Sequence, residues 1–318
     1  MPTPLCDLLG IEHPIVQAPV GAAAVPRLAA AVSNAGALGM LALSWSGDAA
    51  AVVHAARELT SAPVAGNFVL EWDQHARLDA ALAAGLRIVS TTWGDPAAYV
   101  ERAHDGGALA MHTVSTAEEA RRAAACGVDV VVAQGWEAGG HVGGRIATLP
   151  LVPAVVDAVS PLPVIAAGGI GDARGVAAVL ALGAGAAWLG TRFLLAEEAP
   201  VHERYRARLL AADETEALWF ADLFDVGWPN APHRALRNAT TEAWEAAGRP
   251  PPGARPGEGE EVAVAPTGRA VVRYSSGTAL EGTTGDVDAL SLWAGQSVAL
   301  ADRVQPAAEI VRELASRL

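Results

Sequence analysis

One glycine-rich segment, QGWEAGGHVGG, carries the clearest chemical signal in the sequence. It follows a run of valine and alanine, so Gln134 ends an apolar strand. Glycines such as Gly139 and Gly140 let the backbone approach a flat ligand closely, because they have no Cβ. A neutral imidazole, with a pKa of about 6.5, can take up a proton at neutral pH, so His141 is the candidate catalytic base. Only Glu137 accompanies it as a potential ligand, and no metal site is expected.

Two more glycine turns end consecutive apolar runs later in the chain. AAGGIG contains Gly168 and Gly169, and LGTRF contains Gly190 and Thr191. Phosphate groups bind at such turns through backbone N–H donors, which a side chain would block, and Thr191 adds a hydroxyl donor. Together they predict a phosphorylated, flat cofactor, for which FMN fits best and a nucleotide substrate second. The GxGxxG fingerprint of a Rossmann-type NAD site does not follow the first strand.

Two earlier strand ends are also candidates. QAPVG contains Ala18, Pro19 and Val20, and GNF places the amide of Asn67 at the end of a buried strand. Taken alone, each is also an ordinary turn sequence. We interpret them as ligand contacts only because they share an end of the fold with the three glycine-rich turns.

The elements that must position these residues alternate along the chain. Apolar runs without polar alternation predict parallel strands buried on both faces. They are Pro14–Ala18, Leu38–Leu43, Val64–Leu70, Arg87–Thr91, Ala108–His112, Val128–Gln134, Pro163–Ala167 and Ala186–Leu189. The stretches between them predict helices at Val25–Asn34, Ala49–Leu59, Gln74–Ala84, Pro96–His104, Thr116–Ala125, Val152–Val159 and Ala173–Leu182. This α/β alternation favours a (β/α)8 TIM barrel, whose function sits at the carboxyl ends of its strands, over a doubly wound sheet with extra strands.

The residue composition changes after the eighth predicted strand. Residues 196–262 hold a charged helix, an aromatic-rich stretch and a Pro/Gly run, which do not resemble another β/α unit. Their aromatic residues need a surface to pack against, as a lid would have. We therefore expect a barrel of residues 1–195 and 263–318, with 196–262 as a small inserted cap. Helical stretches are expected to close the chain at Ala289–Ala301 and Pro306–Leu318.

Composition excludes several classes of protein. The 318 residues carry a formal net charge of −13, which argues against nucleic acid and anionic membrane partners. None of the 22 basic residues is a lysine, so Schiff-base and P-loop chemistry are excluded. Cys6 and Cys126 are too few for a disulfide framework, which suggests a reducing compartment. The N-terminus has no export pattern, and we expect a cytoplasmic protein.

The motifs in combination resemble the nitronate monooxygenase family, formerly called 2-nitropropane dioxygenases. PIVQAPV, GNF, VVAQGWEAGGHVGG, PVIAAGGIGD and WLGTRF occur in the family's order, and the match returns at AGQS near residue 295. The family consists of FMN-dependent TIM barrels and includes the flavin-type enoyl-ACP reductase. Two positions depart from its pattern. Val20 replaces the usual methionine, and Met111-His112-Thr113 stands where members proven on nitronates often carry a lysine.

The resemblance implies a role for each candidate residue. It implies that the flavin ring and ribityl chain contact Ala18, Pro19, Val20, Asn67 and Gln134, beside the Gly139–Gly140 loop. It implies that the phosphate binds at Gly168, Gly169, Gly190 and Thr191. It places His141 over the ring as the base.

The leading hypothesis is FMN-dependent oxidation of nitroalkanes or alkyl nitronates by dioxygen, giving a carbonyl compound and nitrite. One alternative is an NAD(P)H-dependent flavin reductase acting on an enoyl thioester or a quinone. Another is a flavin-binding protein without activity. A small-molecule substrate and dioxygen are the expected partners, and a homodimer is possible.

Overall fold

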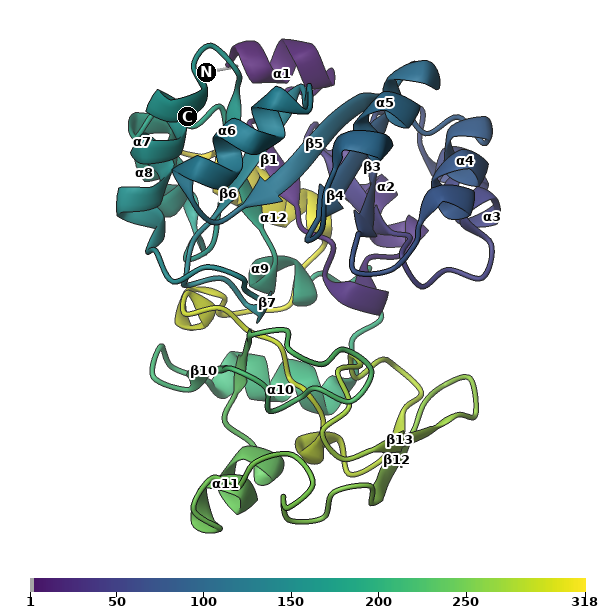
Figure 1. Ribbon diagram of the computed structural model, residues 1–318, viewed down its shortest axis with the longest axis vertical. Helices are drawn as coiled ribbons and strands as arrows, with labels where there is room; N and C mark the ends of the chain where they lie inside the picture. The colour runs from purple at the N-terminus through teal and green to yellow at the C-terminus, as the bar shows by residue number, and fades with distance from the viewer. Residues whose placement is uncertain (1–2) are drawn as a thin grey trace.

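A computed structural model describes residues 3–318, and within them eight parallel strands form a closed barrel (Figure 1). The strands are β1 (Ile15–Gln17), β2 (Gly39–Ala42), β3 (Val64–Val69), β4 (Ile88–Thr92), β5 (Leu109–Val114), β6 (Val130–Gln134), β8 (Val164–Ala167) and β9 (Ala186–Leu189). Their order is β1-β9-β8-β6-β5-β4-β3-β2, and a parallel bridge between Val16 and Leu38 joins the two ends. The TIM barrel expected from the apolar runs is confirmed.

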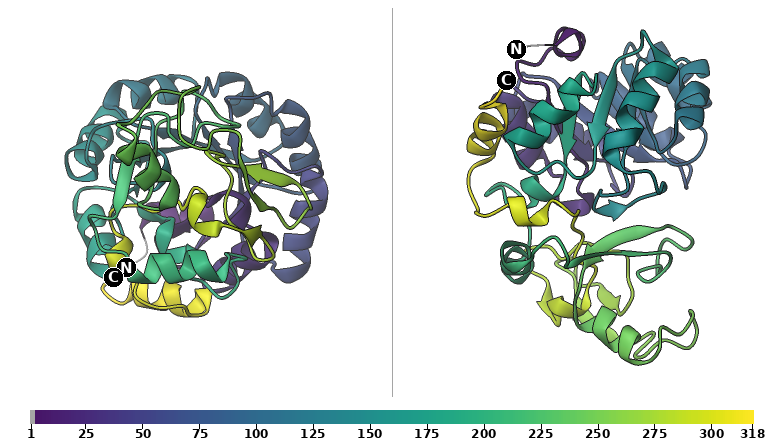
Figure 2. Two further views of the ribbon diagram at one scale, coloured as in Figure 1. Left: turned by 90° about the horizontal axis from the view of Figure 1, so that it is seen from below. Right: turned by 90° about the vertical axis from the view of Figure 1, so that its left-hand side faces the viewer.

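Helices form a ring around the barrel, as Figure 2 shows from below. They are α2 (Pro26–Asn34), α3 (Ala49–Leu59), α4 (His75–Ala83), α5 (Ala97–Asp105), α6 (Ala117–Ala125), α7 (Thr148–Val159), α8 (Ala173–Ala181) and α12 (Ala307–Ala315). The C-terminal helix α12 packs against both α8 and α2 and so completes the ring. The short helix α1 (Pro4–Leu9) covers the amino-terminal end, because Leu5 and Leu9 are buried with the barrel's interior side chains.

Alternation along each strand decides which side chains enter the barrel. Val132 and Ile165 pack together inside it, whereas Val131 and Ala166 pack outward against the helices. Side chains two residues apart share a face. Gln134, at the carboxyl end of β6, therefore points inward like Val132.

A second unit, which we call the lower lobe, lies below the carboxyl ends of the strands (Figures 1 and 2). It contains α10 (Glu203–Ala211), β10 (Ala217–Phe220), β11 (His233–Leu236), α11 (Ala239–Ala246), β12 (Glu261–Val264), β13 (Ala270–Val272) and β14 (Thr284–Gly285). Phe220, Leu223, Phe224 and Tyr274 form a separate small core there. The lobe therefore has its own apolar interior beneath the barrel mouth.

The prediction of a helix at Ala289–Ala301 is wrong. Two short 3-10 turns, η2 (Val287–Ala289) and η3 (Val298–Leu300), stand at its ends, with extended chain between them. Leu236 N donates to Leu292 O at 2.8 Å, so the segment's backbone bonds to β11. Pairing with β11 outweighs the helix propensity of the alanine and leucine residues in this segment.

The predicted bounds of the inserted cap are residues 196–262, and they stay a prediction. We propose a later end, near residue 290, because β12 pairs with β13 and with β14 in one three-stranded sheet. That sheet lies in the lower lobe (Figure 1). Within residues 3–318, no helix has both the length and the apolar character to cross a bilayer.

Candidate active site at the barrel mouth

Polar side chains line the inner face of the barrel near its mouth. Asn67 and Ser90 are directly paired in register on β3 and β4, and Asn67 Nδ2 donates to Ser90 Oγ at 3.1 Å. Both side chains are buried. Across the barrel, Gln134 pairs in register with Ala167 and donates from Nε2 to the carbonyl of His141 at 3.3 Å. Ser90 was not among the predicted site residues.

His141 is fixed by strand pairing with the lower lobe. It lies on β7 (Gly140–His141), a short strand in the loop after β6 that pairs antiparallel with β11. His141 stands opposite His233 in that register, and Val142 N donates to Pro232 O at 2.8 Å. The lower lobe therefore sets the backbone position of the predicted base.

The imidazole of His141 is enclosed by aromatic rings. The Trp228 indole stacks on it with centroids 3.9 Å apart and planes 29° apart, and Trp293 lies 5.3 Å away. Burial, together with the nearby His233, lowers the pKa of His141 to about 3. Its Nε2 is buried and has no hydrogen-bond partner among the described residues. The ring is therefore neutral at pH 7, and no described residue satisfies its Nε2.

The two glycine turns expected to hold phosphate lie after β8 and β9. Gly168 and Gly169 have φ of +97° and +71°, and a Cβ on Gly168 would lie 2.8 Å from the Gly135 carbonyl oxygen. A Cβ on Gly190 would lie 3.5 Å from both Ala18 Cβ and Val20 Cγ1. The first turn thus needs glycine for its backbone. At the second, the missing side chain leaves room beside the predicted Ala18-Pro19-Val20 contacts.

Thr191 begins the one-turn helix α9 (Thr191–Leu194). Its Oγ1 accepts a hydrogen bond from Gly295 N at 3.0 Å. The hydroxyl proton is then free to be donated to a ligand, since a hydroxyl both accepts and donates. The AGQS segment is thereby joined to the second glycine turn.

Some residues of the QGWEAGGHVGG loop shape the loop itself. The Glu137 carboxylate accepts from Thr148 N and Oγ1 at 2.9 and 3.0 Å, away from His141. A Cβ on Gly139 would lie 2.5 Å from the Ala294 carbonyl carbon, and Gly140 has a φ of +70°. Close packing accounts for Gly139, and a left-handed backbone accounts for Gly140.

Two stacked tryptophans with an arginine on each outer side tie this loop to the lower lobe. Trp136 stacks on Trp219 of β10 at 4.9 Å. The Arg234 guanidinium lies over the Trp136 ring, 5.3 Å from its centroid. The Arg145 guanidinium lies over the Trp219 ring, 4.7 Å from its centroid. Arg234 Nη2 also donates to Trp136 O at 2.8 Å. Arg234 is buried and Arg145 is exposed, so the first cation–π contact contributes up to about 2 kcal/mol and the second about 0.5–1 kcal/mol.

His112, on the fifth strand, is not part of the mouth. It alternates with Met111, which packs inside the barrel, so His112 faces the helix layer. Its Nδ1 lies 2.8 Å from Thr91 Oγ1. Burial lowers its pKa to about 4, so it is a neutral residue of the outer layer.

These features fit a flat cofactor with a phosphate group. Asn67 and Gln134 supply inward amides, and the two glycine turns supply close backbone approach. His141 Nε2 is a buried polar atom without a partner in the part of the chain that the structure describes. Buried polar atoms are rarely left unpaired. The fold and the mouth together define a TIM barrel whose mouth residues fit a flat, phosphorylated cofactor such as a flavin.

Comparison with known proteins identifies the family. The family model described as nitronate monooxygenase matches residues 2–76 and 55–317, and the chain belongs to this family of flavoproteins. A nitronate monooxygenase from Paraburkholderia phytofirmans is 33% identical, and the alignment covers 99% of this chain and 94% of that protein. The chain is an oxidoreductase, which counts against the alternative of a flavin-binding protein without activity.

The chain is also similar to a dehydrogenase and to a nitroalkane oxidase. A Mycobacterium tuberculosis protein named (3aS,4S,5R,7aS)-5-hydroxy-7a-methyl-1-oxo-octahydro-1H-indene-4-carboxyl-CoA dehydrogenase is 37% identical over 78% of this chain and 69% of its own length. The solved structure of nitroalkane oxidase from Streptomyces ansochromogenes superposes with a TM-score of 0.76 at 29% identity. It covers 99% of this chain and 97% of that one.

Proposed function

We propose that the protein binds FMN at the barrel mouth and oxidises small nitroalkanes or their nitronates with dioxygen, releasing a carbonyl compound and nitrite. The observation that carries the proposal is the Nε2 of the neutral His141 ring, which has no partner within residues 3–318 and lies at the mouth of a nitronate monooxygenase-family barrel. The full-length nitronate monooxygenase relative supports it.

Each predicted residue has a part in this proposal. Ala18, Pro19, Val20, Asn67 and Gln134 would hold the flavin ring and ribityl chain beside the Gly139–Gly140 loop. Gly168, Gly169, Gly190 and Thr191 would hold the phosphate. The chemistry that the flavin supplies when bound is electron exchange with the substrate and with dioxygen.

His141 acts on the proton of the substrate carbon. Its pKa of about 3 means that the free base is present at every pH above about 4. A neutral nitroalkane next to Nε2 would lose its α-proton to this nitrogen. The nitronate that forms is an anion, and a nearby negative charge favours the protonated imidazole. A preformed nitronate needs no such transfer, so His141 matters most for neutral substrates.

The test compares neutral nitroethane with its preformed nitronate in air, using nitrite release as the readout. Replacing His141 with Ala should lower turnover of the neutral substrate by about 10²–10⁴-fold, the usual contribution of a positioned base. Turnover of the nitronate should change far less. His54→Ala, at an exposed position on α3, is the matched control. Equal turnover of neutral nitroethane by both variants would overturn the role of His141.

The dehydrogenase relative supports a second candidate, an NAD(P)H-linked flavin enzyme acting on an acyl thioester. The chain's net charge of −13 disfavours docking of an acidic carrier protein. Rapid anaerobic reduction of the bound flavin by NADH or NADPH would favour this candidate.

A further inference from the structure

A tryptophan from the lower lobe occupies part of the barrel mouth. Trp228 is 4% exposed and packs with Val69 and Ala231. Val69 is two residues beyond Asn67 on β3, so both side chains face inward. The indole therefore lies one layer above Asn67 and directly against the ring of His141.

Three loops of the barrel contribute tryptophans around it. Trp45 follows β2, Trp72 follows β3 and Trp93 follows β4, with ring centroids 6.2, 5.1 and 5.4 Å from that of Trp228. Trp93 has a φ of +62°, a left-handed conformation that is strained for a non-glycine residue. We call Trp45, Trp72, Trp93 and Trp228 the tryptophan cluster. It lies beyond the carboxyl ends of β2, β3 and β4, where Trp228 is buried and Trp45 is 57% exposed.

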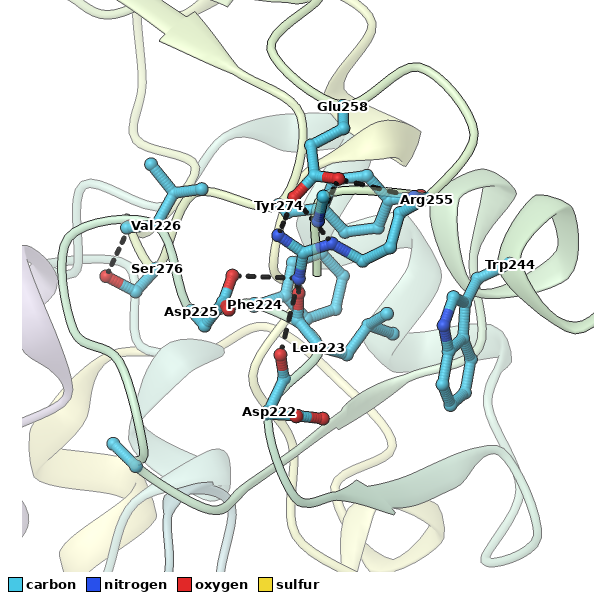
Figure 3. Close-up of polar contacts among 12 residues, drawn as sticks. Asp222, Leu223, Phe224, Asp225, Val226, Trp244, Arg255, Glu258, Tyr274 and Ser276 are labelled. Carbon is cyan, nitrogen blue, oxygen red and sulfur yellow. Dashed lines mark hydrogen bonds and ion pairs between the residues drawn. The ribbon is translucent and has the colours of Figure 1, made fainter. Parts of the chain in front are cut away.

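One end of the loop that carries Trp228 is held by buried Arg255 (Figure 3). Arg255 Nη1 donates to the Asp225 carboxylate at 2.8 Å and to Leu223 O at 2.9 Å. Its Nε donates to Glu258 at 3.0 Å, and its guanidinium lies 4.3 Å from the centre of the Tyr274 ring. We call Asp225, Arg255, Glu258 and Tyr274 the Arg255 knot.

The other end of the loop is held by His233. Phe224 N donates to His233 Nε2 at 3.1 Å, so the ring proton sits on Nδ1, which donates to Ala231 O at 2.9 Å. His233 thus binds the backbone on both sides of Trp228. With the Arg255 knot, it makes the indole a fixed wall of the site.

We propose that Trp228 limits the substrate to small, apolar nitro compounds with short chains. The inference rests on the proposed function and adds its substrate class. The indole stacks on the imidazole with centroids 3.9 Å apart, which leaves no gap between the two rings, so a bulky substituent on a substrate carbon beside His141 would meet the indole. The surrounding cluster is indole and aliphatic, which favours alkyl over charged substituents.

The experiment compares Trp228→Ala with Trp244→Ala in the flavin-loaded protein. Trp244 also belongs to the lower lobe's aromatic residues, packing on Phe220 at 6.0 Å, but Figure 3 places it on the far side of the Arg255 knot from Val226. For each protein, kcat/KM is measured with ethyl nitronate and with 2-phenylethyl nitronate. The parent should prefer the ethyl compound at least tenfold. Trp228→Ala should reduce that preference at least tenfold, and Trp244→Ala should leave it unchanged.

A binding measurement separates failure of the size limit from failure of the proposed function. Propanoate and phenylpropanoate resemble the two nitronates in shape and charge but do not react. Calorimetry should show that the parent binds only propanoate, whereas Trp228→Ala binds both. Inactivity on every nitronate with this binding pattern would refute the function and keep the size limit. Binding of both acids by the parent would overturn the size limit whatever the activity. If Trp228→Ala does not fold, Trp228→Leu serves in its place.

Discussion

Replacing Arg255 with Met removes the charged guanidinium at the centre of the Arg255 knot and keeps most of the length of the side chain. The Arg255 side chain is 3% exposed, while those of Asp225 and Glu258 are 14% and 26% exposed. Removing one partner of a buried ion pair costs about 3–5 kcal/mol. Since water reaches both carboxylates, we expect a loss of about 2–4 kcal/mol in the free energy of unfolding. At about 2.1 cal/mol/K of unfolding entropy per residue, this corresponds to a fall in Tm of about 3–6 °C for the whole chain.

The matched control is Arg249→Met. Arg249 pairs with Glu245, but its side chain is 65% exposed, so we expect a loss below about 1 kcal/mol. Thermal unfolding followed by near-ultraviolet circular dichroism reports both Tm and the packing of the tryptophan cluster. Arg255→Met should lower Tm and weaken the tryptophan signal before the main transition. Equal Tm values for the two variants, with the same tryptophan signal, would refute the anchoring role of Arg255.

Three further predictions concern the site. Ser90→Ala removes the hydrogen-bond partner of Asn67 and should weaken FMN binding about fivefold, measured by flavin fluorescence. Gly190→Val fills the space beside the Ala18-Pro19-Val20 turn and should weaken FMN binding more than Ser90→Ala, with Tm of the apoprotein nearly unchanged. Burial holds the pKa of His141 at about 3 and of His233 at about 4, so between about pH 4 and pH 6.5 these rings take up protons only on unfolding. The free energy of unfolding should therefore fall as pH drops from 6.5 to 4, and denaturant titrations showing no fall would contradict this.

The sequence predicts the barrel because its eight strands are buried on both faces and read as uninterrupted apolar runs. The run Ala186–Leu189 coincides with β9, and the helix Ala49–Leu59 coincides with α3. The stretch Ala289–Ala301 fails because its backbone bonds to β11, a partner about 55 residues earlier in the chain. No local pattern encodes that pairing.

The same distinction separates predicted from missed site residues. Asn67 and Gln134 stand out as polar side chains ending apolar strands. Ser90 does not, because serine also occurs as an ordinary buried strand residue. Trp228 and His233 come from the lower lobe, and only its pairing with β7 brings them to His141.

The most direct test of the central claim is anaerobic reduction of the FMN-loaded protein, followed by its absorbance. Ethyl nitronate should bleach the flavin bands, and admitting air should restore them with release of nitrite. NADPH in the same cuvette arrangement should leave the bands unchanged within the same time. Bleaching by NADPH and none by the nitronate would contradict the account and assign the protein to a reductase branch of the family.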